Sequence, residues 1–102
     1  MALKLSAAAR NARLDAIETL IGVSPILKIR GGSVPANVAA ADSADAVLAT
    51  LTLPSDWMGA ASAGAKAIAG TWQDASADAT GTAAYFRIYV GPAGTVAHIQ
   101  GT

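Results

Sequence analysis

The residues that could do chemistry in this sequence are few, and they do not form a catalytic set. The chain has a single histidine, His98, and no cysteine. Residues 59–64 resemble the turn that presents a nucleophilic serine, but Ser62 stands one residue away from the place that the Gly-x-Ser-x-Gly pattern requires. We therefore expect His98 to be a polar position on a strand rather than a general base, and we expect no enzymatic activity.

Two pairs of aspartates are close enough in sequence to suggest a shared site. Asp74 and Asp78 are four residues apart, and Asp42 and Asp45 are three apart, but both pairs fall in segments rich in Ala, Ser and Gly that predict loops. Spacing within a loop fixes no common face, and neither pair has the pattern of a calcium-binding loop. Our interpretation is that these aspartates cap turns, and we expect no metal and no cofactor.

Four aromatic residues are of the kind that stacks on sugars or bases in other proteins: Trp57, Trp72, Tyr85 and Tyr89. Here we expect them to supply most of the hydrophobic core. An alternative is that Tyr85, Arg87 and Tyr89, which share one face of a predicted strand, contact a neighbouring subunit, because tyrosine and arginine are favoured at protein interfaces.

The element that precedes all of these residues is a predicted helix over residues 6–22. Ser6 is suited to cap it, and Gly22 is suited to end it. Its larger apolar residues recur at spacings of three and four and share one stripe: Leu14, Ile17, Leu20 and Ile21. The opposite side is polar and is expected to face solvent or a partner: Arg10, Asn11, Arg13, Asp15 and Glu18. The stripe needs a partner, and we expect Leu14, Ile17 and Ile21 to contact another chain.

Beyond Pro25 the sequence alternates in the manner of strands. The strand candidates are residues 26–30, 46–53, 65–73, 83–90 and 95–100. The turn at 91–94 makes the last two a hairpin, and 34–44 is an irregular connection. The sequence thus predicts a mainly β fold, a small antiparallel β-sandwich or partly open barrel of about five strands, with one N-terminal α-helix. We divide it into a helical arm, 1–24, and a β domain, 25–102.

The composition predicts a thin core. Of the 102 residues 53% are hydrophobic, but 26 are alanine, and the large aromatic residues number only one Phe, two Trp and two Tyr. A lone domain of this size hides roughly 60–70% of its unfolded surface. Without cysteine there is no disulfide to add stability. We infer that packing against other chains supplies the remainder.

The charge balance argues against two classes of partner. Seven basic residues match seven acidic ones, so the formal net charge is zero and nothing favours binding to nucleic acid. No stretch approaches the roughly 20 apolar residues of a membrane span, and we expect no signal peptide. The expected partners are therefore proteins, with no nucleic acid and no membrane.

Five segments have a distinctive sequence: LSAAARNARLDA at 5–16, LPSDWM at 53–58, GTWQD at 70–74, YFRIY at 85–89 and HIQGT at 98–102. Together they resemble the small structural proteins of tailed bacteriophages and prophages, over nearly the whole chain. The resemblance implies a virion component made in the host bacterial cytoplasm, and it carries over no catalytic residues. In similar phage proteins the chain can continue past the last motif with more β-structure, so an exposed final strand is expected to pair with another chain.

Three functions follow as hypotheses. The first is a head decoration or cement protein, a homo-oligomer and most simply a trimer, which stabilises the capsid by repeated contacts with the major capsid protein or other virion proteins. The second is a trimeric tail fibre, spike or baseplate component whose N-terminal helix is the attachment element. The third is a carbohydrate-binding module that uses Trp57, Trp72 and Tyr89.

Overall fold

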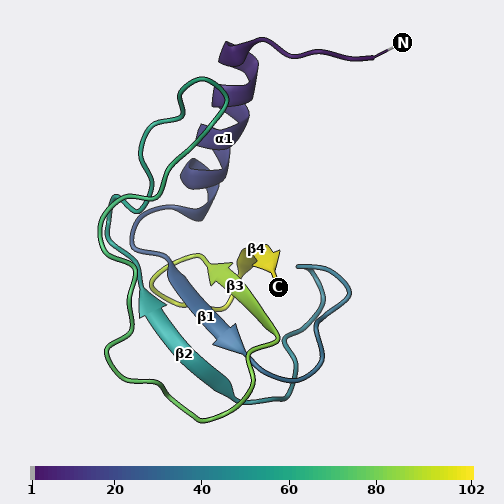
Figure 1. Cartoon of the computed structure of the whole chain (residues 1–102), viewed down its shortest axis with the longest axis vertical. Coiled ribbons are helices and arrows are strands. Elements are labelled where there is room, and N and C mark those ends of the chain that lie inside the picture. The colour runs from purple at the N-terminus through teal and green to yellow at the C-terminus, as the bar shows by residue number, and fades with distance from the viewer. Residues whose placement is uncertain (1) are drawn as a thin grey trace.

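The computed structural model describes residues 2–102, which form one helix followed by a four-stranded antiparallel sheet (Figure 1). The elements are α1 (Ala7–Ile21), β1 (Ile26–Arg30), β2 (Val47–Thr52), β3 (Tyr85–Tyr89) and β4 (Ala97–Gly101). In space the strands follow the order β2-β1-β3-β4. The small, mainly β class with one N-terminal helix is confirmed. Residues 2–102 contain four strands in a single sheet, where about five strands were expected.

The predicted helix has the predicted ends. The Ser6 side chain accepts a hydrogen bond from the backbone N–H of Ala9 at 3.1 Å, as an N-cap residue does. Gly22 ends the helix with a positive φ of 85°, and its N–H donates to the carbonyl of Glu18 at 2.8 Å. The 15 residues of α1 span about 22 Å. Within residues 2–102 no helix is long and apolar enough to cross a bilayer.

The register of the strands gives the sheet two chemically different faces. Leu27 of β1 lies opposite Leu51 of β2 and Ile88 of β3, which places three apolar side chains on one face. Lys28, the next residue, lies opposite Arg87 on the other face. Successive side chains of a strand point to opposite faces. We call these surfaces the apolar face and the polar face.

The prediction of a strand over residues 65–73 is wrong. Much of this stretch belongs to an irregular excursion, residues 58–69, that leaves the sheet and runs beside α1 (Figure 1). At its tip, Ser62 and Ala65 bond to each other around a turn in which residues 63–64 have positive φ angles. The alternating positions of the stretch are mostly alanine and glycine, which bury little area, so joining the sheet would gain little.

The predicted hairpin between the last two strands is confirmed. β3 and β4 pair antiparallel, and the backbone N–H of Val90 donates to the carbonyl of Val96 at 2.8 Å. The turn closes when Gly94 donates to the carbonyl of Val90 at 3.1 Å. Gly94 has a φ of 66°, a conformation that glycine adopts at little cost. The hairpin therefore follows from local sequence.

The hydrophobic core lies where the C-terminal end of α1 meets the apolar face. Trp57 is only 1% exposed, and its indole N–H donates to the carbonyl of Gly22 at 2.9 Å. The ring centroid of Trp72 lies 6.0 Å from the ring centroid of Trp57. The buried residues of this cluster are Ile21, Leu27, Leu53, Trp57 and Ile88. The core is small, and it fastens the helix to one end of the sheet.

The molecule is elongated, with different elements at its two ends. Its extents are 44 × 33 × 21 Å, and the N-terminal end of α1 lies at one end of the long axis while the sheet occupies the other (Figure 1). The predicted boundary between residues 24 and 25 falls in the short link between α1 and β1. Any surface on the start of α1 is therefore held far from the sheet.

Candidate functional site

α1 is attached to the excursion through its polar side. Lys66, whose side chain is 3% exposed, forms ion pairs with Asp15 and Glu18, each at 2.6 Å. One turn earlier, the side-chain oxygen of Asn11 accepts a hydrogen bond from the backbone N–H of Gly64 at 2.9 Å. The sequence pattern assigned the whole polar side to solvent or to a partner. In the structure Asn11, Asp15 and Glu18 of that side bind the helix to its own chain, whereas Arg10 and Arg13 lie beside the apolar stripe.

The charges in this contact shift one another's protonation. The hydrogen bond from Lys66 holds the pKa of Asp15 below its usual value, and a second bond, from the backbone N–H of Ala61 at 3.1 Å, acts in the same direction. The hydrogen bonds to Asp15 and Glu18 raise the pKa of Lys66. Lys66 and Asp15 therefore each favour the charged form of the other, and the ion pair between them is formed at neutral pH.

The apolar stripe of α1 points away from this contact. Ile17 is 42% exposed and Leu20 is 60% exposed, while Leu14 is half-buried. Ile21 differs from the other three because it is buried in the core of its own chain. Of the helix residues predicted to contact another chain, Leu14 and Ile17 are accessible and Ile21 is not.

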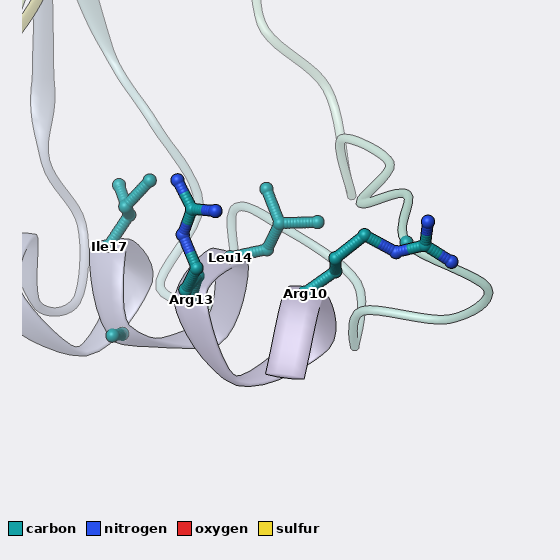
Figure 2. A pocket seen from close by; sticks show the side chains of 6 residues that line it. Arg10, Arg13, Leu14 and Ile17 are labelled. Carbon is teal, nitrogen blue, oxygen red and sulfur yellow. The ribbon is translucent and has the colours of Figure 1, made fainter. Parts of the chain in front are cut away.

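The exposed side of α1 carries two arginines next to the apolar stripe. Figure 2 shows Arg10, Arg13, Leu14 and Ile17 projecting from the same side of the helix. They line an open hollow of about 490 Å³ that Gly64 of the excursion also borders. This surface combines apolar side chains with positive charge, which suits an apolar partner surface that carries acidic groups at its rim.

The polar face of the sheet is covered by the loop between β1 and β2, residues 31–46. Arg87 is buried beneath it. Its guanidinium donates to the carboxylate of Asp42 at 2.8 Å, to the side chain of Gln100 at 2.8 Å, and to two backbone carbonyl groups of the loop. Every nitrogen of the guanidinium has a partner, so the buried charge is compensated.

The two tyrosines beside Arg87 bind the same loop. The hydroxyl of Tyr89 donates to Asp42 at 2.8 Å, and the backbone N–H of Ser43 donates to the hydroxyl of Tyr85 at 3.1 Å. Burial, and then the hydrogen bond to Asp42, raise the pKa of Tyr89. Tyr85, Arg87 and Tyr89 do share one face, as the alternation predicts. The chain's own loop closes that face, so these side chains offer almost no surface to another subunit in this structure.

Asp42 is the residue of the polar face whose role the sequence analysis did not predict. We assigned it to a turn, whereas it accepts hydrogen bonds from Arg87 and Tyr89 and pairs with Arg30 at 3.4 Å. A signal was present in the strands: Lys28, Arg30 and Arg87 all fall on one face, and burying several cations requires a carboxylate nearby. The sequence could therefore have indicated an acidic partner, although not which one.

The apolar face is covered only at the helix end. Farther along, the side chains of Ile29, Leu51, Trp72 and Phe86 line a groove of about 430 Å³. Its lining is completed by Leu27, Ala83, Ala84, Tyr85 and Thr102. Pockets of about 300–1,000 Å³ are large enough to enclose a small ligand or a few side chains. No segment within residues 2–102 fills this apolar groove.

The two edges of the sheet are also unequal. A loop closes the β2 edge, because the backbone N–H of Asp78 donates to the carbonyl of Leu48 at 2.8 Å and the N–H of Thr50 donates to the carboxylate of Asp74 at 3.1 Å. Asp74 also accepts from the N–H of Ser76, which confirms its predicted role in a turn. On the outer side of β4 no strand of residues 2–102 pairs, so that edge is open to another strand.

The polar residues singled out in the sequence are not brought together as a chemical centre. Within residues 2–102 no three of the His, Cys, Asp and Glu side chains lie close enough to share a metal ion. His98 is exposed on β4, and Ser62 lies in the turn of the excursion. Trp57 and Tyr89 are buried, so of the aromatic residues considered for sugar stacking only Trp72 is partly accessible.

No protein-family model, no curated protein and no solved structure matches this chain. The functional conclusion therefore depends on the resemblance of its sequence segments and on its contact surfaces.

Proposed function

We propose that this chain is a structural protein of a bacteriophage virion that decorates and cements the head. The observation that carries the proposal is the apolar surface left uncovered by a chain with a small core: the apolar groove together with Ile17 and Leu20. Exposed apolar surfaces of this kind mark sites of protein contact. The resemblance of five segments to phage structural proteins supports the virion as the place of that contact.

The proposed partners are further copies of the chain, in a trimer, and the major capsid protein. A ligand that binds the assembled shell but not its dissociated subunits stabilises the shell by mass action. Weak contacts repeated over the lattice add up because each one holds the next at high effective concentration. Such a function needs contact surfaces on the chain and no reacting residues.

The internal contacts of the chain support a bridging role. Lys66 fastens the excursion to α1, and Trp57 fastens the end of α1 to the sheet. The exposed stripe of the helix and the apolar groove are thereby held in a fixed position relative to each other. A rigid chain with two separate contact surfaces is suited to joining neighbours in a lattice.

The test is made on particles of the phage or prophage that encodes the chain. We expect hundreds of copies in purified heads, extra density on the capsid surface by electron cryomicroscopy, and heads without the protein that open at lower temperature. Re-adding the purified chain should restore the heat resistance. The double variant Ile17→Asp/Leu20→Asp should not restore it, whereas Val96→Asp, an equally exposed apolar position outside α1, should. Absence of the chain from particles would contradict the proposal.

A tail fibre, spike or baseplate component is the second candidate. The observation that favours it is the projection of α1 beyond the sheet, which suits an attachment element in a trimer (Figure 1). Copy number and position separate the two candidates, because a tail component is present in a few multiples of three and is labelled on tails by antibody. Labelling of heads in hundreds of copies would reject the tail assignment.

A further inference from the structure

A further exposed apolar surface lies in the segment before α1. In residues 2–5, which we call the N-terminal segment, Leu3 is 89% exposed and Leu5 is 38% exposed. The segment is not helical, and it extends away from α1 (Figure 1). Leu3 and Leu5 flank Lys4, so in extended backbone the two leucines point to the same side. Leu3 is almost uncovered by residues 2–102 and Leu5 is partly covered, so the two leucines offer a small apolar surface.

The N-terminal segment does not reach the apolar groove of its own chain. It begins at the end of α1 that lies farthest from the sheet, and α1 spans about 22 Å. Four extended residues cover at most about 14 Å. The N-terminal segment and the apolar groove therefore lie at opposite ends of the molecule, and only another chain can bring them together.

We propose that copies of this chain assemble head to tail, with the N-terminal segment of one copy inserting Leu3 and Leu5 into the apolar groove of the next. There the leucines would contact Ile29, Trp72 and Phe86. The groove has a volume of about 430 Å³, and an apolar cavity of about 150 Å³ already holds a benzene molecule, so two leucine side chains fit. Such a contact is heterologous, and it closes into a ring, a trimer for example, when the rotation between copies allows.

The charges at the two ends support this pairing. Lys4, Arg10 and Arg13 lie at and near the start of α1, and within residues 2–102 none of them forms an ion pair. Asp74 and Asp78 follow Trp72, a residue of the groove lining, on the segment that closes the β2 edge, and their bonds within residues 2–102 go to uncharged groups. A basic end meeting an acidic end directs both the approach and the register of two copies.

The order of charges along α1 leads to the same conclusion. The basic residues Arg10 and Arg13 occupy its first half, and no acidic residue lies in its first turn. The helix dipole favours the opposite arrangement, with acidic groups near the N-terminus. Lys66 explains the acidic residues Asp15 and Glu18 farther along. Acidic groups of a neighbouring copy would give the two arginines the partner that their own helix lacks.

This inference deepens the proposed function, since it names the surfaces through which copies of the chain meet. It is tested on the purified full chain, without particles. A chain that decorates heads but remains a monomer in solution would overturn the inference and leave the proposed decoration of heads intact. A chain that assembles in solution but is absent from particles would do the reverse.

The experiment measures the mass of the full chain against concentration by sedimentation equilibrium. The wild type should form a defined multiple of 10.1 kDa. Leu3→Asp/Leu5→Asp removes the inserted side chains, and Ala83→Trp fills the groove from an exposed position on its rim. Each variant should weaken association on the order of 100-fold. Val96→Asp should leave association unchanged, and circular dichroism should show that all the variants fold.

Mixing the two variants identifies the geometry. Leu3→Asp/Leu5→Asp keeps an intact groove, and Ala83→Trp keeps an intact N-terminal segment, so an equimolar mixture should form pairs of twice the chain mass and nothing larger. If segments or helices paired with one another, Ala83→Trp would assemble as the wild type does, and the proposal would fail. A wild type that stays a monomer up to about 1 mM, a concentration at which even weak association shows, would also overturn it.

Cross-linking gives an independent measurement. Each introduced cysteine reacts specifically because the chain has no cysteine of its own. A mixture of the single variants Leu5→Cys and Ala83→Cys should give a rapid cross-link between two chains. Thr19→Cys, on an exposed position of α1 outside the proposed contact, is the control partner for Ala83→Cys and should react at the background rate. Equal rates for the two mixtures would overturn the proposal.

Discussion

The two faces of the sheet differ in how far the rest of the chain covers them. The polar face is closed by residues 31–46, which bury Arg87 and pair it with Asp42. The apolar face is closed only where Trp57 and the end of α1 lie, and beyond them the apolar groove is open. A chain that folds for itself alone would favour the reverse, because burying apolar area is stabilising and burying charge is costly.

α1 shows the same reversal, because its polar side is covered and its apolar side is exposed. Its polar side binds Lys66 of the excursion, while Ile17 and Leu20 point outwards. The difference suggests a division of roles within the chain. Hydrogen-bonded polar contacts are directional and specify a single arrangement of one chain. Apolar contacts are not directional and are left at the surface, where they are suited to holding chains together.

The largest expected effect comes from the covered part of the apolar face. Trp57→Ala should lower the free energy of unfolding by about 4 kcal/mol, because it removes the centre of the core and its hydrogen bond to Gly22. Trp72→Ala, beside the open groove, should cost only about 1–2 kcal/mol because part of that ring is already exposed. Urea unfolding at low protein concentration measures both, and equal costs would contradict the contrast between the covered and open parts.

Removing the carboxylate of Asp42 from the polar face should destabilise the fold. Asp42→Ala leaves Arg87 buried without its anionic partner, and we expect a loss of about 3 kcal/mol in the free energy of unfolding. Asp56→Ala is the matched control, since Asp56 is exposed and removing it should change stability by less than about 0.5 kcal/mol. A similar result for both variants would show that the loop over the polar face does not depend on this ion pair.

Tyr89→Phe should cost about 1.5 kcal/mol at neutral pH, the usual value of a hydrogen bond to a charged group. The raised pKa of Tyr89 adds a pH dependence. Its contribution is complete below the unfolded-state pKa of about 10 and is lost as the pH rises through the higher folded-state pKa. Stability measured from pH 8 to 12 should therefore fall less steeply in Tyr89→Phe than in the wild type. Tyr85→Phe keeps Tyr89 and should keep the steep fall.

Lys66→Gln should loosen α1 without unfolding the sheet. At pH 7 we expect the backbone N–H groups of α1 to exchange with solvent several-fold faster, while those of the sheet are unchanged. The pKa of Asp15 is lowered in the fold, so its contribution is present above the usual value of 3.8 and is lost as the pH falls through the lower folded-state value. The helix signal in thermal melts should thus differ between variant and wild type at pH 7 and converge once the pH falls below the lowered pKa of Asp15. Lys4→Gln, outside the contact, should show neither effect.

Local sequence was sufficient for the elements whose signals are local. Ser6 and Gly22 marked the ends of α1, and the β-branched alternation of 26–30 marked β1 to the residue. The expected strand at 65–73 failed because alanine and glycine carry no side-chain area that would decide between a strand and a loop. The pattern was present there, but the energy behind a pattern comes from buried area.

The contact surfaces were predicted less well than the fold, for a physical reason. Alternation showed that Tyr85, Arg87 and Tyr89 share a face, but Asp42, which closes it, lies 45 residues from Arg87 in sequence. Helical spacing likewise found the apolar stripe of α1 but not Lys66, which decides which side of the helix is docked. Periodicity tells which residues share a face, whereas long-range pairs decide what covers that face.

The smallest expected effect on folding most directly tests whether the apolar side of α1 is exposed while its polar side is covered. Leu20→Ser should change the free energy of unfolding by less than about 0.5 kcal/mol, because Leu20 is largely exposed. Ile21→Ser, one residue further on, should cost about 3 kcal/mol because it places a hydroxyl in the core. If the two variants lost the same stability, Leu20 would already be covered in the dilute chain, and the outward stripe of α1 would not be available to a partner. If Leu20→Ser folds normally but no longer restores the heat resistance of heads, the stripe acts in assembly and not in folding.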